Sequence, residues 1–189
     1  MRIVAGRFRG KQLTTPSDLS IRPTADRVRE AMFNILASRL GPNFDGLRVL
    51  DLFAGTGALG LEALSRGAVH VTFVDTGAEA RGLIRDHIDA FGAGGIAKLL
   101  RRDATALGPA GSIKPFDLAF LDPPYGRGLG EAALVSLRDG NWLSPGATVV
   151  FEESSDAVIE FPEGFELEDR REYGAAGVHI LKFTRQGRP

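Results

Sequence analysis

The stretch Val49-Leu50-Asp51-Leu52-Phe53-Ala54-Gly55-Thr56-Gly57-Ala58-Leu59-Gly60 decides the fold of this 189-residue chain. It opens with the short apolar run of a central parallel strand whose two faces are both covered. Gly55 and Gly57 then permit positive φ angles and let a ligand approach the backbone, and the start of a helix offers free N–H groups. The stretch therefore predicts a strand, a ligand-binding loop and a helix start in succession.

The acid in this stretch distinguishes between two kinds of ligand. From Gly55 the sequence also spells G-x-G-x-x-G, with Asp75 twenty residues further on, which is the pattern of a nicotinamide dinucleotide site. However, Asp51 and Phe53 occupy the strand end, and a carboxylate there repels phosphate and attracts a cation. The arrangement D-x-F-x-G-x-G resembles the first motif of S-adenosylmethionine-dependent methyltransferases, whose cofactor carries an amino group and a sulfonium.

Composition limits the class of protein. With 43% hydrophobic residues the chain can bury one full core. Cysteine is absent, which excludes disulfides and thiolate metal sites, and His70, His87 and His179 lack metal-ligand spacing, so we expect no metal. No charged leader precedes an apolar run, and no apolar stretch approaches the roughly eighteen residues of a membrane span. We expect a monomeric, cytoplasmic protein that does not contact membranes.

Charge is unevenly distributed along the chain. The net charge is −1, but residues 1–30 carry +4 and the remainder −5. Segments 3–5 and 11–15 are predicted to pair as a short hairpin whose Arg-Phe-Arg tip can stack a base and grip phosphates. Concentrated basic charge around an aromatic residue is typical of nucleic-acid contact. The expected contacts are Arg7, Phe8, Arg9, Lys11 and Arg22.

Periodicity places the remaining elements and brings four acids to strand ends. The predicted helices span about 24–40 (capped by Thr24), 58–66, 79–91 and 129–138. The predicted strands span 69–75, 98–102, 116–121, 147–152 (after a turn at 144–146), 165–171 and 178–183, with the last two forming an antiparallel hairpin. Ligands of open α/β sheets bind beyond the carboxyl ends of the strands, so Asp51, Asp75, Asp103 and Asp122 are expected to converge on one crevice. His87 is interpreted as a histidine at the edge of the core, without a chemical role.

Asp122-Pro123-Pro124-Tyr125 follows a buried strand and is predicted to carry the chemistry. Two prolines hold an extended turn, remove N–H donors and leave carbonyl acceptors exposed. Such acceptors suit a planar base with an exocyclic amine, whose two N–H bonds would be accepted by Asp122 and the Pro123 carbonyl. The nitrogen is then drawn toward tetrahedral geometry and its lone pair can attack a methyl group, while Tyr125 stacks on the base.

Three segments resemble the bacterial 16S ribosomal RNA guanine-N2 methyltransferase family. D-P-P-Y is the mark of methyltransferases acting on exocyclic or amide nitrogen. The segments Arg2-Ile3-Val4-Ala5-Gly6-Arg7-Phe8-Arg9-Gly10-Lys11, Arg22-Pro23-Thr24 with the helix after it, and Arg171-Glu172-Tyr173-Gly174 look like that family. The resemblance covers almost the whole chain.

The resemblance implies an α/β fold of the Rossmann-like class I methyltransferase type. Its features are a mostly parallel seven-stranded sheet with helices on both faces, an antiparallel C-terminal hairpin and a small N-terminal β-hairpin extension. Residues 1–24 would be an RNA-contacting arm and residues 25–189 the methyltransferase domain. The implied reaction takes a methyl group from S-adenosylmethionine, leaving S-adenosylhomocysteine, to N2 of one guanine in 16S rRNA, within a small-subunit assembly particle.

The resemblance also implies site roles, and rival functions remain open. Asp51, Gly55 and Gly57 would surround the methionine part of the cofactor, with Phe53 and Ala54 lining the loop. Asp75 would bind the ribose hydroxyls, and Asp103 beside Ala104 the adenine amine. Adenine N6 in DNA or a glutamine amide in protein would suit the same D-P-P-Y chemistry. A nicotinamide-dependent oxidoreductase and a non-catalytic RNA-binding protein on the same fold are the remaining alternatives.

Overall fold

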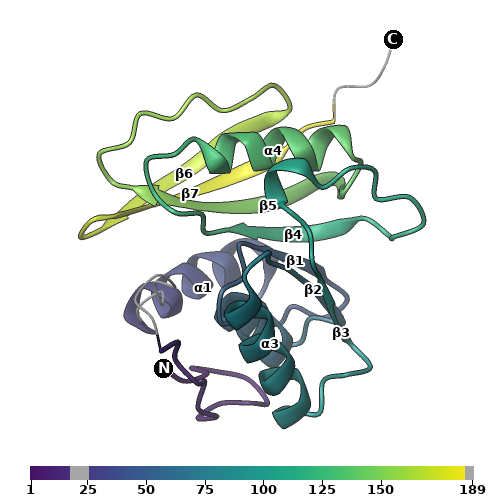
Figure 1. Cartoon of the computed structure of the whole chain (residues 1–189). Coiled ribbons are helices and arrows are strands. Elements are labelled where there is room, and N and C mark those ends of the chain that lie inside the picture. The colour runs from purple at the N-terminus through teal and green to yellow at the C-terminus, as the bar shows by residue number, and fades with distance from the viewer. Residues whose placement is uncertain (18–25, 186–189) are drawn as a thin grey trace. The chain divides into compact units, whose positions relative to one another are not determined.

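The computed structural model describes residues 1–17 and 26–185 of the chain (Figure 1). They belong to two compact units, Met1–Arg101 and Arg102–Pro189. Two residues singled out in the sequence, Arg22 and Thr24, lie outside the described residues, as does the expected domain boundary after residue 24.

Over its described residues, the first unit contains three parallel strands and three helices. β1 (Arg48–Leu52) pairs with β2 (His70–Val74), which pairs in turn with β3 (Ala97–Leu100). The helices are α1 (Asp26–Leu40), α2 (Ala58–Ser65) and α3 (Ala78–Ala90). All eight residues of α2, the helix that follows the glycine loop, are buried.

The second unit continues the α/β pattern and closes with antiparallel strands. Its elements are η1 (Ala104–Ala106), β4 (Phe116–Leu121), α4 (Leu129–Asp139), β5 (Leu143–Ser154), β6 (Phe165–Tyr173) and β7 (Ala176–Phe183). β4 and β5 are parallel, whereas β7 is antiparallel to both β5 and β6. The predicted C-terminal hairpin is therefore present, with Gly174 at positive φ in its turn.

The predicted fold class is confirmed. Over the described residues the seven strands follow the order β3-β2-β1-β4-β5-β7-β6, mostly parallel with antiparallel C-terminal strands. Strand β4 begins and ends at the predicted residues, and the other elements agree within a few residues. No helix within residues 1–17 and 26–185 has both the length and the apolar character needed to cross a bilayer.

Two local predictions need correction. The N-terminal hairpin is present but shorter than predicted: Arg2 and Gln12 form an isolated antiparallel bridge, and backbone hydrogen bonds join Ile3 to Lys11 and Leu13 to Met1. The predicted turn at residues 144–146 lies instead inside β5. The β4–β5 register jumps there, from Phe116–Leu143 to Leu118–Thr148. Such an irregularity tolerates a proline because no ladder N–H is needed at that position.

Helical spacing of apolar residues predicts one buried stripe on α1, formed by Val28, Ala31, Met32, Ile35, Leu36 and Leu40, and the buried face differs from it. Met32 and Leu36 are buried as expected, but Val28 and Ile35 are only half-buried. Phe33 and Arg29 are fully buried in their place. A charged residue was not expected on the inner face, and its burial is explained by a partner on α2, Glu62.

Candidate active site

The carboxylate of Asp51 is directed at the start of α2. Asp51 is 1% exposed, and its Oδ2 accepts a hydrogen bond from the Gly60 N–H at 2.9 Å. The free N–H groups in the first turn of a helix are ordinarily satisfied by such an acceptor. A buried carboxylate at a strand end is expected to face backbone amides or a ligand, and here it faces an amide. The same bond ties β1 to α2 across the glycine loop.

The loop between β1 and α2 has the backbone that its glycines predicted. Gly55 has φ +58° and Gly57 +78°, and Gly57 is the N-cap of α2. Phe53 also has a positive φ, 55°, which is uncommon for a residue with a bulky side chain. The Ala54 N–H donates to the Val74 carbonyl at 3.2 Å, which holds the loop against the end of β2.

Asp75 joins two loops in the first unit. Its Oδ2 accepts from the Gly55 N–H at 3.0 Å and its Oδ1 from the Gly77 N–H at 2.7 Å. Asp75 is half-buried, and each carboxylate oxygen can accept more than one hydrogen bond. The side chain therefore fixes the glycine loop and retains capacity to accept hydroxyl groups, as a ribose-binding acid requires.

Asp103 lies beyond β3 and begins the short η1 helix of the second unit. Its Oδ1 accepts from the Thr105 N–H at 2.8 Å and the Thr105 hydroxyl at 2.7 Å. These bonds, the hydroxyl first, lower the pKa of the Asp103 carboxyl below its usual range. Asp103 is exposed and Ala104 is buried beneath it. The Asp103 carboxylate is therefore an ionised acceptor at neutral pH, suited to an amine donor.

Two buried acids on β5 position the Asp-Pro-Pro-Tyr turn. Asp122 follows β4 directly. The Tyr125 hydroxyl donates to Glu152, and the Gly126 N–H donates to Glu153 Oε1 at 3.0 Å. Glu153 Oε1 also accepts from its neighbour Ser154 N–H at 2.7 Å.

Sequence reasoning missed both of these acids. Glu152 and Glu153 are 5% and 3% exposed, which is rare for carboxylates unless they are partnered. Their signal was available, since two consecutive acids end the buried apolar run of β5. Glu152 holds the turn at the Tyr125 side chain, and Glu153 holds it at the Gly126 backbone amide.

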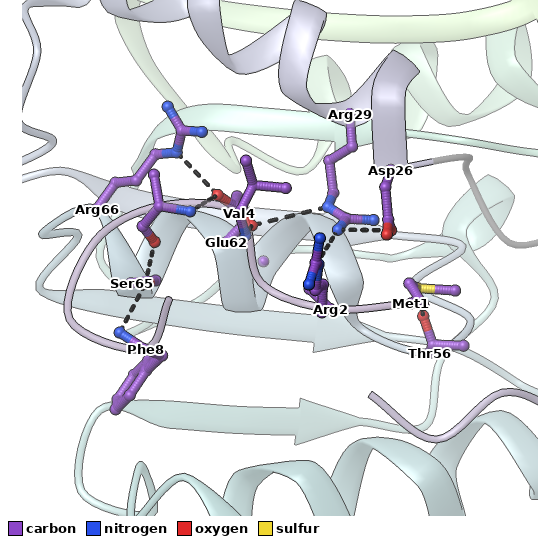
Figure 2. Close-up of polar contacts among 12 residues, drawn as sticks. Met1, Arg2, Val4, Phe8, Asp26, Arg29, Thr56, Glu62, Ser65 and Arg66 are labelled. Atoms are coloured by element: carbon purple, nitrogen blue, oxygen red, sulfur yellow. Dashed lines mark hydrogen bonds and ion pairs between the residues drawn. The ribbon is translucent and has the colours of Figure 1, made fainter. Parts of the chain in front are cut away.

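The N-terminal arm, here residues 1–17, docks on α2 (Figure 2). Glu62 Oε2 accepts from the Val4 N–H at 3.0 Å and Oε1 from the Ala5 N–H at 3.1 Å. The Phe8 N–H donates to the Ser65 hydroxyl at 2.9 Å. Figure 2 shows that these groups come from one helix, so the arm follows the course of α2.

The side chains at the tip of the arm are partly engaged within the first unit. The half-buried Phe8 ring packs against Phe91 with 5.1 Å between ring centroids, and Arg7 lies 4.8 Å over the Phe8 ring. Lys11 Nζ lies near both rings and donates to the Ala90 carbonyl at 3.2 Å. Arg7, Arg9 and Lys11 are nevertheless exposed.

The predicted site residues divide between the two units. The first unit brings together Asp51, Phe53, Ala54, Gly55, Gly57 and Asp75 around one loop. The second contains Asp103, Ala104, Asp122, Pro123, Pro124 and Tyr125. Convergence of the four acids on one crevice stays a prediction, and so does RNA contact by the arm.

This chain matches known proteins along nearly its whole length. The model of the family described as Conserved hypothetical protein 95 matches residues 1–182. YlbH of Bacillus subtilis is 38% identical over 187 residues, which is 96% of this chain and 98% of YlbH. Ribosomal RNA small subunit methyltransferase D of Escherichia coli is 33% identical over 188 residues, 99% of this chain and 92% of that protein.

Solved structures agree with these relatives. The structure of yhhF from Escherichia coli superposes with a TM-score of 0.84 at 31% identity, covering 98% of this chain and 99% of yhhF. Structural neighbours of this kind are class I methyltransferases. The chain therefore belongs to the family described as Conserved hypothetical protein 95, the family of the ribosomal RNA small subunit methyltransferase D proteins.

Proposed function

We propose that this protein transfers a methyl group from S-adenosylmethionine to the exocyclic N2 of one guanine in 16S rRNA. The observation that carries the proposal is the Asp-Pro-Pro-Tyr turn after β4, held by Glu152 and Glu153 at its tyrosine and at the next amide. A turn fixed in this way presents acceptors of constant geometry. Full-length relatives named ribosomal RNA small subunit methyltransferase D support rRNA as the substrate class.

The first unit supplies residues that fit S-adenosylmethionine. Asp75 offers a carboxylate to the ribose hydroxyls, and the Gly55–Gly57 backbone at positive φ lets the methionine part approach without meeting a Cβ. The Asp51 carboxylate favours the cofactor's positive charge. When bound, the cofactor supplies an electrophilic methyl group on sulfur. Asp103, in the second unit, is assigned to the adenine amine.

Residues of the second unit are assigned to the guanine. The Asp122 carboxylate and the Pro123 carbonyl accept the two N–H bonds of N2, which localises its lone pair for attack on the methyl carbon. As the new N–C bond forms, the Asp122 carboxylate would take the N–H proton that it holds, and the bound cofactor would supply the methyl group by releasing it from sulfur with the bonding electrons left on sulfur. Tyr125 stacks on the extruded base, which offsets part of the cost of unstacking it.

The arm supplies charge for the RNA backbone. Arg7, Arg9 and Lys11 lie on an exposed surface around Phe8, and we assign phosphate contacts to them and to Arg22. Because Phe8 packs on Phe91, its first role is to hold the arm's tip in place. A small-subunit assembly particle is the proposed setting, since it presents this RNA before the subunit is complete.

Cofactor choice is tested by calorimetry with S-adenosylmethionine and with a nicotinamide dinucleotide. The wild-type protein should bind only the first, and Asp75→Asn should weaken that binding by about 1.5–3 kcal/mol, the range for hydrogen bonds to a charged group. Binding of the dinucleotide alone would identify an oxidoreductase and overturn the proposal.

RNA contact is tested by measuring affinity for protein-free 16S rRNA over a range of salt concentrations. Arg9→Ala should reduce the slope of log affinity against log salt by about 0.7, the value for one phosphate contact on a single strand. Arg170→Ala, which removes an exposed arginine of β6, is the matched control and should keep the wild-type slope. An unchanged slope in Arg9→Ala would remove this residue from the RNA contacts.

A further inference from the structure

His87 on α3 uses both ring nitrogens inside the first unit. The residue is 3% exposed. Its Nε2 accepts a hydrogen bond from the Thr14 N–H at 2.9 Å, and its Nδ1 lies 2.8 Å from the Thr56 carbonyl oxygen. A carbonyl can only accept, so Nδ1 carries the proton and Nε2 the lone pair. The ring is thus a neutral bridge with one defined tautomer.

The two partners of His87 belong to functionally different segments. Thr14 is in the N-terminal arm, to which RNA contact is assigned. Thr56 stands between Gly55 and Gly57 in the loop assigned to the cofactor. The same loop residue has a second contact with the arm, since the Thr56 hydroxyl lies 3.8 Å from the Met1 sulfur (Figure 2).

Helix α2 provides a further connection between arm and loop. It begins directly after Gly57, and Asp51 in the strand before the loop holds its Gly60 amide. Glu62 and Ser65 on the same helix accept the backbone amides of the arm, as Figure 2 shows. A ligand that orders the loop therefore orders elements on which the arm rests.

We infer that His87 is a positioning residue that couples binding of S-adenosylmethionine at the loop to docking of the arm, and hence to RNA binding. The inference rests on the proposed function and adds a regulation of that site. A cofactor that fixes the loop fixes the Thr56 carbonyl, which holds the His87 ring in the orientation that accepts from Thr14. By linkage, RNA bound to the arm raises cofactor affinity by the same factor.

The direct test is amide hydrogen exchange of Thr14 in the wild-type protein, with and without S-adenosylmethionine. Exchange of Thr14 should slow about fivefold or more when the cofactor binds, the lower end of usual coupling factors. The Trp142 amide, which donates to the Leu137 carbonyl in the second unit, serves as the internal control for general stabilisation. Unchanged exchange of Thr14 relative to Trp142, with cofactor bound, would overturn the inference.

Three variants separate coupling from a purely structural role. His87→Asn retains a donor near the Nδ1 position for Thr56, and His87→Gln retains an acceptor near the Nε2 position for Thr14, so each breaks one link. Ile88→Val, at a buried neighbour on the same helix, alters packing without touching a hydrogen bond and is the matched control. For each, the affinity for protein-free 16S rRNA is measured with and without S-adenosylmethionine.

The ratio of the two RNA affinities is the decisive readout. The wild type and Ile88→Val should bind RNA about fivefold or more tightly with cofactor, and both His87 variants should show a ratio near one. If the His87 variants weaken both ligands but keep the wild-type ratio, His87 is structural only and the inference is wrong. If wild-type protein shows no calorimetric binding of S-adenosylmethionine, the proposed function itself fails, and the inference falls with it.

Discussion

Tyr125 is half-buried in the turn after β4, and its hydroxyl donates a hydrogen bond to Glu152 on β5, so a side chain distant in sequence sets the orientation of the ring. Replacing Tyr125 with alanine should reduce methyl transfer roughly 5- to 150-fold, because stacking of a base on an aromatic ring contributes about 1–3 kcal/mol. Cofactor affinity, measured by calorimetry, should stay at the wild-type value.

The Tyr125→Phe variant is the control for this substitution. It keeps the ring and loses only the bond to Glu152, so its activity should lie between those of the wild type and Tyr125→Ala. Wild-type turnover in Tyr125→Ala would contradict the stacking role.

For single residues, local motifs in the sequence predict backbone conformation, but they do not reveal hydrogen-bond partners that are distant in the chain. The positive φ angles of Gly55 and Gly57 follow from the motif alone. Glu152, by contrast, accepts a hydrogen bond from the hydroxyl of a tyrosine that lies 27 residues away in the sequence. The sequence favours an ordinary core-edge role for His87, because nothing in its helix shows that Thr14 and Thr56 lie on either side of its ring.

Among the elements, α2 contributes a buried acid, Glu62, that pairs with two arginines of the first unit. The side chains of Glu62 and Arg29 are both fully buried, 3.7 Å apart, and Glu62 also accepts from Arg66 at 3.0 Å. Glu62→Ala should lower the free energy of unfolding by about 3–5 kcal/mol, because Arg29 then loses its buried carboxylate and keeps the partly exposed Asp26, and the Val4 and Ala5 amides lose their acceptor. Urea denaturation measures the change.

Glu172→Ala is the matched control for the buried acid. It removes an exposed acid that pairs with Arg170 on β6, and it should change the free energy of unfolding by no more than about 0.5 kcal/mol. Equal effects of the two substitutions would show that the Glu62 network contributes no more than a surface pair.

Two glycines of the arm offer a matched pair of substitutions. Gly6 and Gly10 have φ of +82° and +84°, so alanine costs about 1–2 kcal/mol of backbone strain at each. Only at Gly6 would the new Cβ also collide, 1.9 Å from the Ser65 carbonyl oxygen. Gly6→Ala should therefore release the arm from α2 and speed hydrogen exchange of the Val4, Ala5 and Phe8 amides.

Gly10→Ala should leave these amides protected, because nothing lies within 4 Å of the position that its new Cβ would take. The same exchange rates in both variants would mean that the close approach to Ser65 does not hold the arm in place.

The bounds of an element can be predicted where a single local sequence pattern determines them. Strand β4, an apolar run broken only by Asp117, is located to the residue. Pro145 and Gly146 predict a turn over 144–146, but pairing with β4 on both sides keeps this segment within β5. On α1, helical spacing of apolar residues cannot reveal Arg29 as an inward residue, because its partner Glu62 belongs to another helix.

For the molecule as a whole, two histidines with lowered pKa values contribute to the expected response to pH. Burial lowers the pKa of His179, whose Nδ1 lies 3.1 Å from the Phe151 carbonyl. Burial, followed by the charges of Arg48 and Lys98, also lowers the pKa of His70. As the pH falls below about 6.5, the unfolded chain binds protons that the folded protein does not, so the free energy of unfolding should fall.

Urea denaturation at pH 7.5 and 5.5, values chosen to lie about one unit on either side of the ordinary histidine pKa, measures this loss. His179→Gln should show a smaller loss of stability between the two, because one of the titrating groups is gone. Greater stability at the lower pH, or the same loss in His179→Gln, would contradict this assignment.

The fold class and the chemistry of the family can be predicted at this scale, because local motifs and a near full-length resemblance carry them. The docking of the arm cannot, because it depends on Glu62 and Ser65 meeting backbone amides 57 and 58 residues away. The positive charge of the arm can nevertheless be predicted from the sequence, because its arginines lie close together near the N-terminus.

A single measurement distinguishes methylation of guanine N2 in 16S rRNA from the alternatives. Labelled methyl groups are transferred from S-adenosylmethionine to unmodified small ribosomal subunits and to protein-free 16S rRNA, and the nucleosides are then analysed. We expect N2-methylguanosine at a single site, and the better of the two acceptors identifies the stage of assembly. A protein that binds the cofactor and labels neither RNA, but methylates adenine N6 in DNA or a glutamine amide, would contradict this expectation.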